Sequence, residues 1–164
     1  MKKNSSFLKC FSLAVFAFAL FSASSVFAQT DKMDKMDKME KKEKSLYERL
    51  GGYDALAAVT DDFIGRLAGD KKLGKFFVGL SNDSKKKVRQ HVVDFLCLAT
   101  GGPCAYTGRD MKLVHTGLGI TKEEWDISVK HLIATLDKFK VPEKEKGEVL
   151  AAIGGLEKYI VEKK

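Results

Sequence analysis

Apolar residues recur every three or four positions through most of the chain after residue 45, a spacing typical of helices that bury one face. The pattern predicts helices that begin at Ser45, Asp54, Ser84, Thr121 and Pro142. The sequence has no convincing run of alternating apolar and polar residues that would predict a strand. We therefore expect an all-α domain over residues 45–164.

The ends of these helices carry recognisable signals. Ser45 with Glu48, and Thr121 with Glu124, have the spacing of capping boxes, in which each side chain satisfies a free backbone N–H of the first turn. The Gly-Gly-Pro run at residues 101–103 ends the helix before it. These signals predict where the domain begins and where the irregular segment in its middle begins and ends.

Residues 103–120 contain four glycines or prolines and predict only a short helix, near Asp110 to Val114. A compact domain rarely contains so long an irregular segment unless the segment has a function. His115 lies in it among apolar residues, without the carboxylate or cysteine spacing of a zinc site and without that of a catalytic triad. From the pattern alone, His115 is either a satisfied core residue or a ligand.

Residues 1–28 have the composition of a secretory signal peptide. Three lysines precede an apolar run, and Val26-Phe27-Ala28 forms a cleavage signal before Gln29. The alternative is an uncleaved membrane anchor, because the run approaches the length that spans a bilayer. Its serines and the cleavage signal argue against that. We expect an exported, periplasmic protein with no membrane attachment after cleavage.

Residues 29–44 form a charged low-complexity linker that is too poor in apolar residues to fold alone. Its three methionines, Met33, Met36 and Met39, raise the alternative of a thioether site for a soft ion such as Cu(I). Because no cysteine or histidine reinforces them, a solvated linker is the better interpretation.

Charge and cysteine content narrow the class of protein. The chain has 29 basic and 22 acidic residues; loss of residues 1–28 removes three lysines and leaves a net charge of +4. No dense basic stripe is present, which argues against nucleic acid as a partner. Cys10 leaves with the signal peptide, and two cysteines in an exported chain indicate a Cys97–Cys104 disulfide. The alternative is a pair of buried thiols.

Four motifs resemble those of the group I truncated haemoglobins. They are the opening run at residues 45–52 (SLYERLGG), Phe76-Phe77, the glycine-rich segment at residues 101–111, and His115 ahead of residues 117–121 (GLGIT). They occur in the family's order and spacing, and they span residues 45–164. His115 stands where the family has its proximal histidine.

The resemblance implies a truncated globin fold, a two-over-two helical sandwich around haem b whose iron His115 binds. It also implies a haem-lining set from several helices: Phe63, Phe77, Phe95, Tyr106, Met111, Val114, Ile120 and Trp125.

The distal side departs from the family pattern. Ile64 stands where the family usually has a tyrosine, and Val88 and Val92 stand where it often has glutamines, so an apolar distal pocket is expected with Ser128 and His91 as its polar groups. His91 is either a second, sixth ligand of the iron or a residue at the haem edge. His131 lies off its helix's apolar face and is expected in solvent.

These features predict a haem protein that binds diatomic gases, O₂, NO or CO, and draws on an electron donor of unidentified class. An enzymatic alternative is a haem-dependent NO dioxygenase or peroxidase, although Ile64 cannot donate a hydrogen bond to bound O₂. An alternative of another class is a haem-free helical module, exported to bind metal or a partner.

Overall fold

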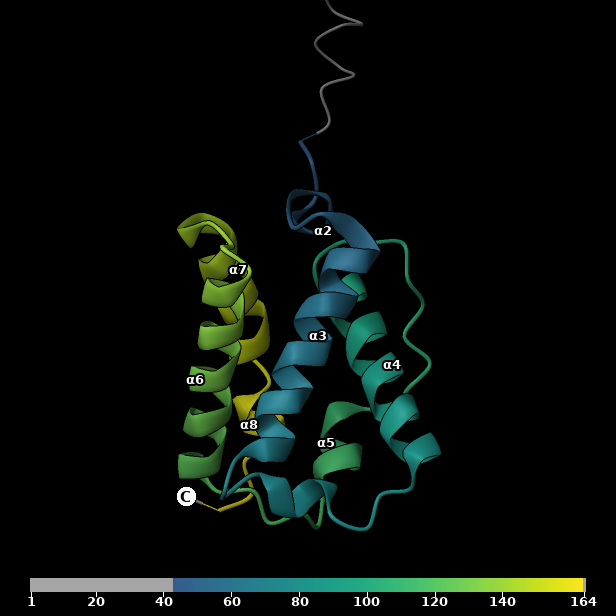
Figure 1. The fold of residues 1–164 in the computed structure, drawn as a ribbon, viewed down its shortest axis with the longest axis vertical. Coiled ribbons are helices and arrows are strands. Elements are labelled where there is room, and N and C mark those ends of the chain that lie inside the picture. Colours follow the sequence, from purple (N-terminus) through teal and green to yellow (C-terminus); the bar gives the residue numbers. More distant parts are fainter. Residues whose placement is uncertain (1–42, 164) are drawn as a thin grey trace, which may run out of the picture. The chain divides into compact units, whose positions relative to one another are not determined.

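The computed structural model describes residues 43–163; the expected signal peptide and residues 29–42 of the expected linker lie outside them. Figure 1 shows the helices of this region. They are α2 (Leu46–Arg49), α3 (Gly52–Gly69), the 3₁₀ helix η1 (Gly74–Phe77), α4 (Asn82–Ala99), α5 (Met111–His115), α6 (Lys122–Lys138), α7 (Glu143–Gly154) and α8 (Glu157–Ile160). The described residues form no strand, only an isolated parallel bridge between Thr121 and Lys163. None of the described helices has the length and apolar character to cross a membrane.

Both predicted capping boxes are present. The Glu48 carboxylate accepts the Ser45 backbone N–H at 2.7 Å, and the Ser45 hydroxyl accepts the Glu48 N–H at 3.2 Å. Thr121 and Glu124 make the same pair of contacts at 2.9 and 3.2 Å. Each box therefore satisfies two donors that a helix start leaves free, and it fixes where α2 and α6 begin.

Three predicted boundaries are wrong. The helix expected from Asp54 begins two residues earlier, at Gly52. The helix expected from Ser84 begins at Asn82, because Ser81 is the residue whose hydroxyl accepts the Ser84 N–H, at 3.1 Å. The single helix expected after Pro142 is divided into α7 and α8 at Gly154 and Gly155. Two successive glycines lower helix propensity at one point, and the α-helix is interrupted there.

The core lies between two pairs of helices, α3 with α4 and α6 with α7, which is a two-over-two arrangement (Figure 1). One buried cluster joins α3 to α6 and α7 and contains Val59, Leu132, Leu136 and Val149. A second joins α3 to α4 through Leu56, Leu96 and Cys97. The apolar faces predicted from helical spacing are thus the faces that meet.

The segment between α4 and α5 is irregular, as expected, and is tied down at its start. Cys97 and Cys104 form a disulfide with their Cα atoms 5.8 Å apart. At Gly102 an added Cβ would lie 2.6 Å from both the Cys97 sulfur and the Tyr47 ring, so only glycine fits this close approach. The Tyr47 N–H also donates to the Thr100 carbonyl at 2.8 Å. These contacts fix the origin of the loop that leads to α5.

The expectation that His131 lies in solvent is wrong. Its Nε2 lies 2.9 Å from the Asp70 carboxylate, and both side chains are largely covered. A helical wheel of α6 places His131 off the apolar face but contains no information about Asp70, which follows α3. The pair links the C-terminal end of α3 to α6.

Candidate functional site

A cavity of about 400 Å³ lies between the helices, with walls from α3, η1, α4, α5, α6, α7 and α8. Its lining is mostly aliphatic and aromatic, which is typical of sites for large apolar ligands. All of the haem-lining, iron-binding and distal residues expected from the sequence line it: Phe63, Ile64, Phe77, Val88, His91, Val92, Phe95, Tyr106, Met111, Val114, His115, Ile120, Trp125 and Ser128. Residues from distant parts of the chain thus share one cavity.

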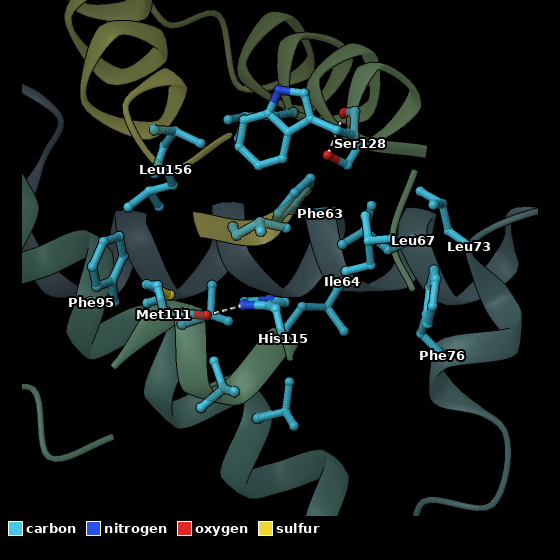
Figure 2. A pocket seen from close by; sticks show the side chains of 18 of the residues that line it. Phe63, Ile64, Leu67, Leu73, Phe76, Phe95, Met111, His115, Ser128 and Leu156 are labelled. Carbon is cyan, nitrogen blue, oxygen red and sulfur yellow. Dashed lines mark hydrogen bonds between the residues drawn. The ribbon is translucent and has the colours of Figure 1, made fainter. Parts of the chain in front are cut away.

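His115 is the last residue of α5, a helix of 5 residues that Asp110 caps. Figure 2 shows its imidazole beside Met111, with Phe63 and Ile64 of α3 nearby. The His115 Nδ1 lies 2.7 Å from the Met111 carbonyl oxygen. A carbonyl only accepts, so Nδ1 donates to it; this contact selects the neutral tautomer in which Nε2 has the lone pair. A hydrogen bond from one ring nitrogen to a backbone carbonyl is a usual way in which a protein orients a histidine whose other nitrogen binds a metal.

The other polar side chains of the wall, the second histidine aside, are already bonded to the protein. The Tyr106 hydroxyl donates to the Arg109 carbonyl at 2.9 Å, and the Ser128 hydroxyl donates to the Trp125 carbonyl at 2.7 Å. Glu124 is buried, caps α6 and contacts Lys75 at 2.5 Å. The Lys75 ammonium, together with the Thr121 N–H, holds the pKa of the Glu124 carboxyl below its usual value.

His91 lies on α4 with Val88, Val92 and Phe95 at the cavity wall. Its ring packs edge-to-face against Tyr106, with centroids 6.0 Å apart, and Tyr106 packs in the same way against Phe95 at 5.6 Å. Burial, with a smaller effect from Asp110, raises the pKa of Tyr106, so this phenol stays neutral. Among the described residues, none forms a hydrogen bond with the imidazole of His91.

Comparison with known proteins identifies the family. The model of the bacterial-like globin family matches residues 45–162. Group 1 truncated hemoglobin GlbN of Mycolicibacterium paratuberculosis is 40% identical over 112 residues, which cover 68% of this chain and 80% of that protein. The protein of the same name from Synechocystis is 36% identical over 114 residues, or 67% and 90%. The chain belongs to the group I truncated haemoglobins.

Solved structures agree with this assignment. Truncated hemoglobin from Tetrahymena pyriformis in the Fe(III) form superposes with a TM-score of 0.66 at 27% identity, covering 72% of this chain and 98% of that one. The 2/2 hemoglobin from Synechococcus, in the cyanomet state and with covalently attached heme, gives a TM-score of 0.64 at 30% identity, covering 71% and 95%. The two-over-two fold predicted from the sequence is confirmed.

The cofactor of this truncated haemoglobin is haem b, and the cavity fits it. Haem needs a broad apolar slot and a side-chain ligand for its iron, which in globins is a histidine. The cavity provides apolar walls on several sides and two imidazoles, of which that of His115 has its Nδ1 held by a backbone carbonyl. Membership of a haem-binding family also favours the haem-protein hypothesis over the haem-free module.

Sequence reasoning missed part of the lining of this truncated haemoglobin. The cavity also contacts Leu67, Leu73, Phe76, Leu80, Leu96, Leu118, Glu124, Val129, Leu132, Ile153, Leu156 and Ile160. Most of these belong to the apolar helix faces, where spacing cannot separate a core residue from a cavity wall. Leu118 had a usable signal, because it is an apolar residue within the loop that follows His115.

Proposed function

We propose that this chain binds O₂ or NO at an iron atom held by His115, in a distal pocket whose own side chains offer bound gas almost no hydrogen bond. The chain is a haem protein that binds gases; the proposal names the ligand residue and the pocket. Haem, when bound, supplies an iron atom that takes a diatomic gas as an axial ligand. The protein's part is to hold the iron, shape the pocket and exclude water.

The single observation that carries this proposal is the setting of His115. It is a cavity-lining imidazole whose Nδ1 is held by the Met111 carbonyl at 2.7 Å, so that Nε2 is the nitrogen left to bind iron in the neutral ring. His91, the second imidazole of the wall, has no corresponding anchor among the described residues. An anchored imidazole is the better permanent ligand, and an unanchored one is better suited to reversible binding.

The apolar distal pocket favours gas binding over an enzymatic role. Ile64, Val88 and Val92 line it with aliphatic carbon, and the hydroxyls of Ser128 and Tyr106 are already donated to backbone carbonyls. A gas bound there gains little from hydrogen bonds, which disfavours the NO dioxygenase and peroxidase alternatives. Gas binding or electron transfer fits this pocket better. We further propose that His91 occupies the sixth position of the iron in the absence of gas.

We also propose that the protein works outside the cytoplasm, in the periplasm. The signal peptide expected at residues 1–28 is the basis, and the Cys97–Cys104 disulfide supports it, because disulfides persist in oxidising compartments. Cleavage is tested by N-terminal sequencing of the protein recovered from the periplasmic fraction; Gln29 is the expected first residue.

The experiment that tests the proposed ligand compares His115→Ala with wild type by visible spectroscopy and by haem transfer to an acceptor protein. We expect the variant to lose haem or to bind it far more weakly, because apolar packing alone leaves the iron without its anchor. His131→Gln is the matched control, since it changes a histidine outside the cavity. A wild-type spectrum and haem affinity in His115→Ala would refute the assignment.

A further inference from the structure

The carboxylate of Glu162 binds the loop that follows His115. One oxygen accepts the Gly117 N–H at 2.7 Å, and the other accepts the Gly119 N–H at 2.5 Å. These two donors hold the pKa of Glu162 below its usual value, so the group is a carboxylate at neutral pH. Glu162 lies beyond α8 and 45 residues after Gly117, so this contact joins distant parts of the chain.

The two glycines present their N–H groups together because both have a left-handed backbone. Gly117 has a φ of 86° and Gly119 a φ of 64°, values that other residues rarely adopt. At Gly117 an added Cβ would meet nothing within 4 Å, so conformation rather than space requires glycine there. The N–H groups of Gly117 and Gly119 converge on one carboxylate, and backbone N–H groups that converge in this way make a binding site for an anion.

Backbone hydrogen bonds hold Glu162 in place. Its N–H and that of Lys163 both donate to the Ile120 carbonyl, at 2.9 and 3.2 Å. The Lys122 N–H in turn donates to the Lys163 carbonyl at 3.0 Å. Residues 162–163 are therefore fixed against the start of α6, and the carboxylate is presented to the loop from a rigid base.

The helix that carries His115 needs such support. Helix α5 has 5 residues and none of them is buried, whereas isolated helices shorter than about 12 residues are marginal in water. Asp110 caps its first turn, with its carboxylate accepting the Lys112 N–H at 2.9 Å. At the other end, the Leu118 N–H donates to the His115 carbonyl at 3.1 Å, within the loop that Glu162 holds.

We propose that Glu162 is a positioning residue for His115: by fixing residues 117–119 it sets the orientation of the imidazole toward the iron. The inference rests on the proposed function, because it assumes that His115 is the iron ligand. Glu162 lies outside the cavity lining and acts through the loop alone.

The test uses the haem-loaded protein and the variants Glu162→Ala and Glu162→Gln. The first removes both acceptors, and the second leaves one amide oxygen as an acceptor. Glu157→Gln is the matched control, because it makes the same change in the same terminal segment at a residue that contacts Lys122 and not the loop. Hydrogen exchange reports the Gly117 and Gly119 amides, and proton NMR of the cyanide-bound ferric protein reports the His115 ring.

We expect exchange at both amides to accelerate about tenfold or more in Glu162→Ala and less in Glu162→Gln, with Glu157→Gln unchanged. The hyperfine-shifted His115 ring signals should move in the same order, and the rate of haem loss should rise. Cyanide occupies the sixth position, so the state of His91 does not affect this measurement.

Two results would overturn the inference in distinguishable ways. Faster exchange with unmoved His115 ring signals would leave Glu162 as a residue that only secures the end of the chain. Absence of a hyperfine shift from His115 in wild type itself would show that His115 is not the ligand, which refutes the proposed function and the inference together.

Discussion

Opening the Cys97–Cys104 bond should lower stability by an amount that the structure allows us to work out. The bond closes a short loop, with a sequence separation of 7. In the chain-entropy model, closing a loop of this size lowers the entropy of the unfolded chain and so raises the free energy of unfolding by about 2.5 kcal/mol at 25 °C. For a domain of about 120 residues, with an unfolding entropy of about 2.1 cal/mol/K per residue, this corresponds to a fall in Tm of about 10 °C.

Chemical reduction opens the disulfide without changing any side chain, so it isolates the effect of loop closure on stability. Cys97 is fully buried beside Leu56 and Leu96, and its thiol remains there as a small apolar group, so reduction creates no cavity. Thermal unfolding of haem-loaded protein is followed by far-UV circular dichroism with and without dithiothreitol. In Cys104→Ala, which has no bridge to open, the reductant should leave the Tm unchanged.

The reasoning fails if reduced and oxidised wild-type protein melt within about 2 °C of each other, since loop closure would then contribute little. It also fails if the protein recovered from the periplasm has two thiols that alkylate without reductant. A much larger loss, accompanied by release of haem, would mean that the bridge acts mainly by holding the loop that carries Tyr106 to the cavity wall.

Three further results are expected. His91→Leu should convert the ferrous haem to a five-coordinate, high-spin form and speed CO binding, because no imidazole then competes for the sixth position; a wild-type ferrous spectrum that is already high-spin would refute this role. Ile64→Tyr should slow O₂ dissociation about tenfold by adding one hydrogen bond to bound gas, with Ile64→Phe as the control for size; equal rates in the two variants would contradict an apolar distal pocket. Asp70→Asn should remove part of the acid sensitivity of folding. The His131 contact and two backbone N–H groups lower the pKa of Asp70 from 3.8 to about 2, so its carboxylate stabilises the fold above pH 4 and this contribution is lost as the pH falls through about 2. Urea unfolding of wild type and variant should converge near pH 2, and a constant difference from pH 6 to pH 2 would contradict the assignment.

Helix positions follow directly from local features of the sequence. The Ser45–Glu48 and Thr121–Glu124 boxes start α2 and α6 as predicted, because a capping box involves residues three apart and needs no distant partner. Apolar spacing likewise predicts which face of each long helix is buried. Errors arose where two local signals competed, as with Ser81 against Ser84 at the start of α4.

The role of His115 could not be predicted from the spacing and composition of the residues around it. Spacing and composition left His115 as either a core residue or a ligand, and the resemblance to a family favoured the second. The structure adds the Met111 contact and the cavity, neither of which is a property of the sequence around His115. Many cavity-lining residues were likewise indistinguishable from core residues until the helices were packed.

Local patterns in the sequence predicted the helices, the all-α class and the irregular segment around His115, and the resemblance to a family added the two-over-two arrangement. Three contacts became visible only once the helices were packed: His91 with Tyr106, Asp70 with His131, and Glu162 with the loop after His115. Local hydrogen bonds and helical periodicity join residues a few positions apart, so the sequence displays them. Contacts such as that of Glu162 with Gly117 join residues 45 positions apart, and their formation depends on how every intervening helix packs.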